Sequence, residues 1–407
     1  MIAVIAFGAA ALAAVLISRR AAADPVTPQA VSLAAWFSTL ALFSLHRMPY
    51  VPLSARTWTV IAAALVTLVL SLSAGTWIGR TLFRNPPSPS RLALRRARAW
   101  IPVYALLGLS GMAWYVWNIQ RILGWDALAD GARIRAALGS YTIPSTFLFL
   151  QFFCVVTPLV ALTVRLLGER LRPVDLAGAG LCVVATWLST DRTQFFTLAS
   201  ASCFLALYLH GHRLSLRALA LAAAAGLAVV ALNFAVISRW VGKSSEASAY
   251  VYATASFPAL DVALGSPPSG TGGRHVFFPI VRLLDRLHLV SGPLPSPIFD
   301  YAAVTRGRPG GELLFNGYTW LNYPYQDWGL AGVFPYVAVV GLAGGVLYGR
   351  VRANRHRPVP LLLLAQFATG LLLSPFVNKF NNTASWYIAV FSVIPFLAVS
   401  WRGADRR

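Results

Sequence analysis

Acidic residues and lysines are scarce in this chain of 407 residues. It has 13 Asp and Glu against 34 Lys and Arg, and only two of the basic residues are lysines, Lys243 and Lys379. Charged residues make up 12% of the chain and apolar residues 57%, with a mean hydropathy of +0.64. Soluble globular domains carry about 25% charged residues. The composition therefore excludes an ordinary soluble domain and predicts an all-α polytopic membrane protein.

The sequence also lacks the motifs that bind nucleotides or metals. It contains no Walker loop, no His-x-x-x-His pair, no cysteine cluster and no Gly-x-Ser-x-Gly elbow. The three cysteines, Cys154, Cys182 and Cys203, fall inside apolar stretches, where we expect them to pack as small apolar side chains. These absences argue against a nucleotide-driven machine and a zinc enzyme, and they predict neither a metal nor a cofactor.

The net charge of +21 raises the question of nucleic-acid binding. The basic residues, however, cluster in short loops between apolar stretches, as the positive-inside rule describes for membrane proteins. We therefore expect membrane lipids and not nucleic acid as partners.

Apolar stretches long enough to cross about 30 Å of hydrocarbon recur along the chain. They predict a single membrane domain over 1–407 with about eleven helices, near 2–18, 28–45, 58–79, 99–120, 145–165, 174–190, 193–209, 217–238, 327–349, 359–376 and 385–401. In the first, Arg19 and Arg20 follow the apolar residues, which favours an uncleaved helix with its N-terminus outside. Alternation then places 20 of the 34 basic residues, and the C-terminus, in the cytoplasm.

One external connection, 239–326 between the eighth and ninth helices, is far longer than the others, and loops of this length are usually functional or carry their own structure. Within it, 250–265 is a candidate short helix. Segment 275–289 places Phe277, Ile280, Val281 and Leu284 on one helical face and charged residues on another. This pattern is typical of a helix in the membrane interface.

The end of this loop, 306–332, is polar, aromatic and rich in glycine, and it leads directly into the ninth helix. Several arginines are also expected on the outer face. Guanidinium groups there suit multidentate binding of phosphate or diphosphate. The alternative is that these arginines anchor lipid headgroups or pair with neighbouring acids. They are Arg133, Arg135, Arg192, Arg274, Arg306 and Arg308.

Three local patterns resemble the Wzy-type oligosaccharide repeat-unit polymerases, the O-antigen polymerase family of bacterial inner membranes. They are Arg133 or Arg135 before the fifth helix, Arg192 in a Ser-Thr-Asp-Arg-Thr turn, and Asn316-Gly317-Tyr318-Thr319 followed by YQDWGLAG at 325–332. The resemblance implies a GT-C-like, multi-pass glycosyltransferase of the plasma membrane that needs no metal. Such enzymes move a glycan from a polyprenyl diphosphate carrier to a sugar hydroxyl of another lipid-linked unit. A chain-length regulator and a flippase of the same pathway are possible partners.

The resemblance also suggests roles for individual residues. Arg192, with Arg133 or Arg135, would stabilise the diphosphate leaving group. Arg274, Arg306 and Arg308 would hold a second diphosphate, and Glu312 or Asp327 would act as the base. Asp327 has a structural alternative, since an acid at the N-terminus of the ninth helix is stabilised by the helix dipole. Sugar contacts are expected from Asn316, Tyr318, Thr319 and Tyr325, with an interfacial aromatic belt as the alternative for the aromatic residues.

Three other functions are alternatives for the same topology. A glycosyltransferase with a polyprenyl monophosphate sugar donor usually shows an acidic motif in its first external loop, but 46–57 contains no acid. An O-antigen ligase would move a finished glycan onto a lipid core, but that group has a histidine where Phe315 precedes Asn316 here. A flippase or exporter of lipid-linked sugars would need charged residues midway through its helices, and these are nearly absent. The polymerase is therefore the favoured hypothesis.

Overall fold

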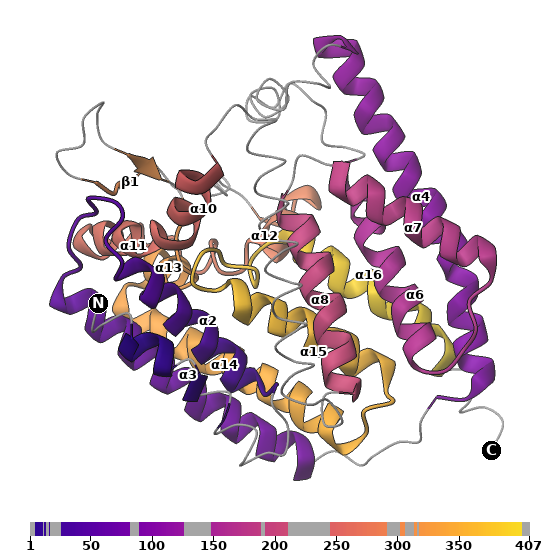
Figure 1. Ribbon diagram of the computed structural model, residues 1–407, viewed down its shortest axis with the longest axis horizontal. Coiled ribbons are helices and arrows are strands. Elements are labelled where there is room, and N and C mark those ends of the chain that lie inside the picture. Colours follow the sequence, from indigo (N-terminus) through magenta and orange to yellow (C-terminus); the bar gives the residue numbers. More distant parts are fainter. Residues whose placement is uncertain are drawn as a thin grey trace. The chain divides into compact units, whose positions relative to one another are not determined.

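The computed structural model describes residues 5–10, 12–13, 16, 26–81, 89–125, 148–188, 192–210, 245–290, 302–305, 313–315 and 317–400. These residues are mostly helical (Figure 1). Four helical stretches are long and apolar enough to cross a membrane. They are α3 (Ala55–Thr81), α4 (Arg91–Leu123), α14 (Leu330–Ala353), and Phe149–Leu166, where the short helix η2 (Leu148–Phe152) continues into α6 (Phe153–Leu166).

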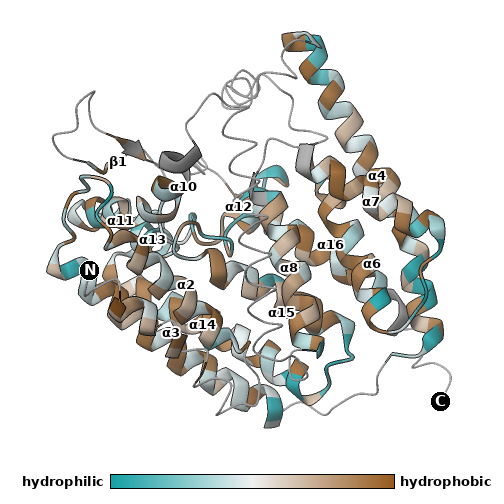
Figure 2. Ribbon diagram, in the orientation of Figure 1, coloured by the Kyte–Doolittle hydropathy of each residue, from teal (hydrophilic) through white to brown (hydrophobic). Residues whose placement is uncertain are grey.

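Five shorter apolar helices accompany these spans. They are α2 (Pro28–Phe43), α7 (Pro173–Leu188), α8 (Arg192–His210), α15 (Pro358–Leu373) and α16 (Thr383–Ser400). Apolar residues run along the helices, whereas hydrophilic residues gather at connections such as the one between α6 and α7 (Figure 2). The prediction of an all-α membrane protein is thus confirmed as a class. The count of eleven spans and their orientation stay predictions, and the expected span 217–238 lies outside the described residues.

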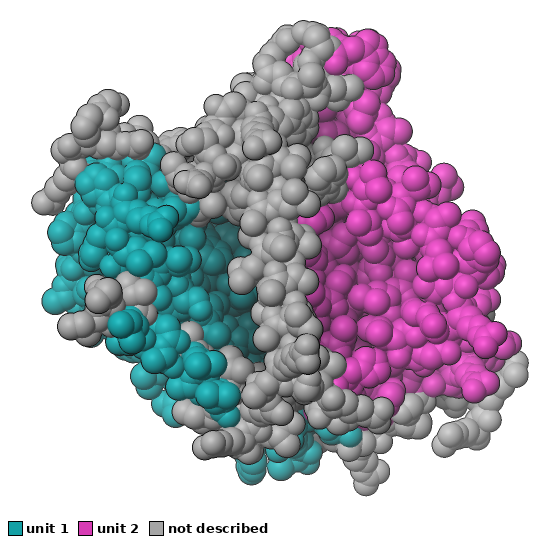
Figure 3. Space-filling view, in the orientation of Figure 1, with its two compact units in different colours: residues 1–85, 249–353, 367–386 teal, residues 86–248, 354–366, 387–407 magenta. Residues whose placement is uncertain are grey.

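The chain divides into two compact units, which are coloured separately in Figure 3. Unit 1 comprises 1–85, 249–353 and 367–386, and unit 2 comprises 86–248, 354–366 and 387–407. The single membrane domain over 1–407 stays a prediction. Unit 1 contains α2, α3, α14 and the described part of the long loop, so it contains the segment around Asp327.

Unit 2 is organised around α4, α6 and α7. Cys154 and Cys182 lie in its core with Ala105, Met112 and Tyr115, which confirms the packing role predicted for those two cysteines. All three cysteines are free, but Cys203 is exposed and not buried as the sequence suggested.

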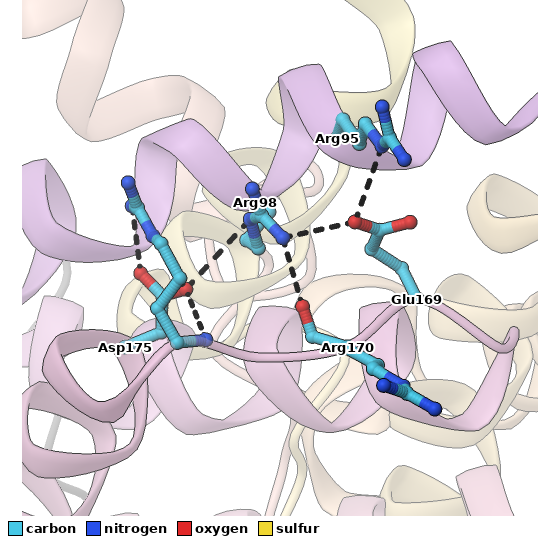
Figure 4. A network of polar contacts seen from close by, with 6 residues as sticks. Arg95, Arg98, Glu169, Arg170 and Asp175 are labelled. Atoms are coloured by element: carbon cyan, nitrogen blue, oxygen red, sulfur yellow. Dashed lines mark hydrogen bonds and ion pairs between the residues drawn. The ribbon is translucent and has the colours of Figure 1, made fainter.

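A network of ion pairs fastens the turn after α6 to α4 (Figure 4). The Asp175 carboxylate is fully buried and accepts hydrogen bonds from Nε and Nη2 of Arg172, at 3.1 and 3.0 Å. Arg98 Nη1 donates to Glu169 Oε1 and to the carbonyl of Arg170, both at 2.9 Å. A buried charge is tolerated when it is paired in this way. These arginines therefore fix the turn after α6 against α4.

The long loop carries its own structure, as its length suggested. Its helices are α10 (Ser245–Thr254), α11 (Ser256–Gly265) and α12 (Phe278–Arg286), so the single helix expected over 250–265 is in fact two. Strands β1 (Ala302–Ala303) and β2 (Leu314–Phe315) pair antiparallel, a ribbon that the all-α prediction did not include. A small core joins α11 to the segments of β1 and Tyr318; its residues are Ala255, Ala259, Ala263, Ala302, Val304 and Tyr318.

Two further contacts attach the loop to the N-terminal part of unit 1. Tyr50 forms an antiparallel bridge with Thr305, next to the short ribbon. Asp261 Oδ1 accepts hydrogen bonds from Ser54 N at 2.8 Å and from the hydroxyls of Ser54 and Thr57. This carboxylate lies at the N-terminus of α3, where the helix dipole stabilises a negative charge.

Close packing of α3 against α14 forms the framework of unit 1 (Figure 1). Glycines recur every four residues on both helices, as Gly75 and Gly79 on α3 and as Gly341, Gly345 and Gly349 on α14. A Cβ atom at Gly345 would overlap the carbonyl oxygen of Leu72, and one at Gly75 would overlap that of Leu342. Small residues at this spacing let two membrane helices approach backbone to backbone.

We expect Gly345→Ala to destabilise the protein, because the added methyl group meets backbone atoms that cannot rotate away. Overpacking of this kind costs about 1–3 kcal/mol. The matched control is Gly180→Ala on α7, where nothing lies within 4 Å of the added atom. There the higher helix propensity of alanine should leave stability equal or raised. Apparent melting temperatures of the purified proteins in detergent would test this, and equal values for both variants would contradict the packing argument.

Candidate functional site

The Asp327 carboxylate is the centre of a buried polar cluster in unit 1. Asp327 lies in the last turn of α13 (Asn322–Trp328) and is 2% exposed. Gly329 ends that helix with φ +64, a conformation that favours glycine, and α14 begins at Leu330. The expected span 327–349 therefore starts three residues later, and Asp327 is not at the N-terminus of a membrane helix. The helix-dipole role considered for it does not apply.

Three donors from a single turn, 271–276, surround this carboxylate. Oδ1 accepts a hydrogen bond from the Thr271 hydroxyl and another from the backbone N–H of His275 at 3.1 Å. Oδ2 accepts from the backbone N–H of Val276 at 2.8 Å. Hydrogen bonds to an ionised group are stronger than neutral ones. The carboxylate thus fixes the turn that leads into α12.

The connection between α15 and α16, residues 374–382, meets the same cluster from another side. Asn381 Nδ2 donates to the carbonyl of His275 at 3.0 Å, and Asn378 Nδ2 donates to the Tyr336 hydroxyl at 3.2 Å. Both asparagines and Lys379 are buried in this turn. The sequence analysis assigned no role to this segment. The sequence feature that could have indicated it is the run Asn-Lys-Phe-Asn-Asn at 378–382. Three amide side chains between two apolar helices are not expected to be there for apolar packing.

The same connection is also fixed to α2 and α11. Trp36, buried in α2, donates from Nε1 to Ser374 Oγ at 2.9 Å, and the Ser256 hydroxyl donates to the carbonyl of Pro375 at 2.7 Å. The backbone N–H of Trp320 donates to the carbonyl of Ser374 at 3.1 Å. Three parts of unit 1, namely α2, α11 and the segment before α13, therefore meet at this short turn.

Aromatic side chains pack beside the cluster. The rings of Tyr336 and Phe380 lie 5.8 and 5.4 Å from that of Trp320. Burial, and to a smaller degree the neighbouring Tyr318, raises the pKa of Tyr323 to about 12. The Tyr323 hydroxyl therefore stays protonated at physiological pH and can donate a hydrogen bond.

Two buried polar atoms beside these rings have no hydrogen-bond partner within the described part of the chain. They are Thr319 Oγ1 and Asn322 Nδ2, on residues that are 0% and 1% exposed. A buried polar group normally has a partner, so each is open to a water molecule or to a ligand hydroxyl.

The structure brings some of the predicted site residues together. Asp327, Arg274, Tyr318, Thr319 and Tyr325 all belong to unit 1. Arg274 is half-buried in the turn that Asp327 holds. The Tyr325 hydroxyl donates to the carbonyls of Ser266 and Leu264, at 2.7 and 3.3 Å, so it fastens α13 to the end of α11. That contact gives Tyr325 a structural role, while its sugar contact stays a prediction.

Other predicted residues cannot be placed. Arg192 begins α8, in unit 2, and its side chain lies outside what the structure describes. The remaining predicted residues, Arg133, Arg135, Arg306, Arg308, Glu312 and Asn316, lie outside the described residues.

Comparisons with protein-family models, with curated proteins and with solved structures find no match to this chain. The function must therefore be inferred from the residues and their geometry.

We expect Asp327→Asn to destabilise the protein by about 1–3 kcal/mol, because an amide has one acceptor atom in place of two and leaves a buried donor unsatisfied. The matched control is Asp285→Asn on the half-buried surface of α12, where the same loss of charge should change little. Apparent melting temperatures in detergent would measure both. Equal decreases in melting temperature for the two variants would show that the three hydrogen bonds to Asp327 do not stabilise the protein.

The stability of the fold should depend on pH through His275. Burial lowers the pKa of this histidine from its ordinary value of 6.5, and the nearby Asp327 only partly opposes the effect. Since the folded pKa is the lower one, the unfolded chain binds more protons as pH falls. The contribution of His275 to stability is thus fully present above about pH 6.5 and decreases below it.

His275→Gln should therefore make the melting temperature less sensitive to pH between about pH 7.5 and 5. The exposed His288, replaced by Asn, serves as the control and should leave the wild-type pH profile unchanged. A wild-type profile in the His275→Gln protein would contradict the assignment.

Proposed function

We propose that the protein is a multi-pass glycosyltransferase of the bacterial inner membrane that polymerises lipid-linked oligosaccharide units. The observation that carries the proposal is the position of the Asp327 cluster. Although the chain consists mainly of apolar helices, carboxylate, amide, imidazole and phenol groups are buried together at one end of the span α14. Polar groups in membrane proteins are costly and mark functional sites.

The reaction needs only groups of the types found in this chain. A hydroxyl of the acceptor sugar attacks the anomeric carbon of the donor glycan. The bond from that carbon to the carrier diphosphate breaks, and the diphosphate leaves with the electron pair. The hydroxyl proton passes to a carboxylate base. Arginines stabilise the charge that develops on the diphosphate, and this electrostatic assistance requires no cofactor.

The described residues suggest how these tasks are divided. Asp327 already accepts three hydrogen bonds, so we assign it the positioning of the 271–276 turn and leave the role of base with Glu312. Arg274, half-buried in that turn, keeps its assignment to a diphosphate. The open atoms Thr319 Oγ1 and Asn322 Nδ2 and the donor hydroxyl of Tyr323 supply groups that can bind sugar hydroxyls.

Deletion of the gene, followed by electrophoresis of the surface polysaccharide, tests the proposal. The deletion strain should display single repeat units on its acceptor in place of long polymer. Complementation with Arg192→Ala should fail to restore polymer, because the leaving diphosphate loses its stabilising charge. Arg96→Ala, at an exposed position on α4, should restore it fully and is the matched control.

Other banding patterns would identify a different activity. A strain without surface glycan but with free polymer on its lipid carrier would indicate a ligase-type transferase. A strain that displays neither polymer nor single units would indicate a flippase or exporter. Normal polymer length in the Arg192→Ala strain, with the variant expressed at the wild-type level, would remove that arginine from the mechanism.

A further inference from the structure

Helix α12 presents a continuous apolar stripe that the described residues leave uncovered. Exposed fractions are 49% for Phe277, 39% for Ile280, 56% for Leu283 and 57% for Leu287. Spacings of three and four residues place these side chains on one face of the helix. The sequence pattern predicts Val281 and Leu284 on this face, but both are half-buried. The stripe is therefore rotated from its expected position.

The other faces of α12 carry its charges. Arg282 and Asp285 are half-buried, Arg286 is exposed, and Arg274 precedes the helix in the 271–276 turn. Three arginines against one aspartate make this segment basic. An apolar stripe beside basic residues is the pattern of helices that lie on anionic lipid.

The start of α12 is at the end of a membrane span. The ring of Phe277 meets that of Trp328 edge to face, with centroids 6.3 Å apart. Trp328 ends α13 and is 40% exposed, and the span α14 begins two residues later at Leu330. The end of a span marks the boundary of the hydrocarbon, where tryptophan is favoured. The first turn of α12 therefore lies beside the start of α14, at the level expected for lipid headgroups.

The same turn is bonded to the candidate site. The backbone N–H groups of His275 and Val276 both donate to Asp327, and the backbone of Phe277 follows directly. Gly273 leaves no room for a side chain, because a Cβ atom there would lie 2.8 Å from the indole of Trp328. Movement of α12 would therefore be transmitted to the Asp327 cluster over a few residues.

We propose that α12 docks into the interface of the lipid bilayer and that this docking holds the 271–276 turn on Asp327. The apolar stripe enters the acyl region and the arginines bind anionic headgroups. The bilayer thereby sets the geometry of the site at the depth where the headgroup of a lipid-linked ligand is found. The inference depends on the membrane location of the chain and not on the reaction proposed for it.

Collision of nitroxide labels with dissolved probes tests the docking. Leu283→Cys, Leu287→Cys and Asp285→Cys, each with Cys203→Ser to remove the exposed natural thiol, would be labelled and reconstituted in vesicles of phosphatidylethanolamine and phosphatidylglycerol at 3:1. Labels at 283 and 287 should collide with oxygen and be shielded from a nickel chelate. The label at 285 should show the reverse. Nickel accessibility at 283 equal to that at 285 would overturn the proposal.

The same labels distinguish lipid from a second copy of the chain. Shielding by lipid should be unchanged when the lipid-to-protein ratio is raised tenfold. Shielding from oxygen and nickel alike, lost on dilution, would mean that another protein molecule covers the stripe, and would also overturn the proposal.

Hydrogen exchange tests the coupling to the site. In Leu283→Glu/Leu287→Glu, the amides of peptides covering 271–278 should exchange at least tenfold faster than in the wild type in the same vesicles. Val262→Glu, which places an acid at an exposed apolar position on α11, should leave those peptides unchanged. Unaltered protection in the double variant would show that docking does not hold the turn. Because exchange is read without substrate, this outcome is independent of polymerase activity.

Discussion

A carboxylate that is buried from water must be surrounded by donors, and in this protein that requirement brings separate parts of the chain together. Asp327 lies at the end of α13, immediately before a membrane span, and its donors come from a turn fifty residues earlier in the chain. Asn381 then fixes the far side of that turn through the carbonyl of His275. The long loop is therefore attached at its middle and its end, and its short helices have defined positions.

The span α14 supplies the rigid base for this arrangement. Two of its glycines, Gly345 and Gly349, lie directly against the backbone of α3, so the two helices approach closely there. The first turns of α14 consequently have a fixed position relative to α2, α3 and α11, which carry Trp36, Asp261 and Ser256. Membrane helices lack the hydrophobic drive that folds soluble domains, and close van der Waals packing takes its place. The polar cluster thus adjoins one end of a helix pair that packs closely through glycine.

Two polar networks in this chain serve different purposes. In unit 2, Arg98 and Arg172 form ion pairs with Glu169 and Asp175, and these pairs fix the turn after α6 against α4. In unit 1, the cluster around Asp327 is saturated, but the adjoining Thr319 and Asn322 keep open atoms. A buried polar atom without a partner is costly, so Thr319 and Asn322 are the reason for proposing sugar contacts beside the Asp327 cluster.

Much of the architecture could be predicted from local pattern. Apolar length located the helices, because a stretch that is uniformly apolar over about twenty residues has few alternatives in a membrane. Helical spacing identified α12, and the sequence of the 306–332 segment pointed to Asp327. The 374–382 turn was missed, since its asparagines acquire meaning only from His275 and Tyr336, which are distant in the chain. The break at Gly329 was missed too, because the apolar pattern continues through it.

The sequence by itself determined that this is a helical membrane protein with one structured loop and a polar segment at the end of that loop. These properties follow from composition and from periodicity, which act on each stretch independently. Only the tertiary structure decided that Asp327 binds the 271–276 turn and not the start of a helix, that the exposed face of α12 is the one bearing Leu283 and Leu287, and that α3 and α14 meet through glycine. Hydrogen bonds and contacts between distant residues depend on packing in three dimensions, and no local pattern encodes which partner a buried group will find.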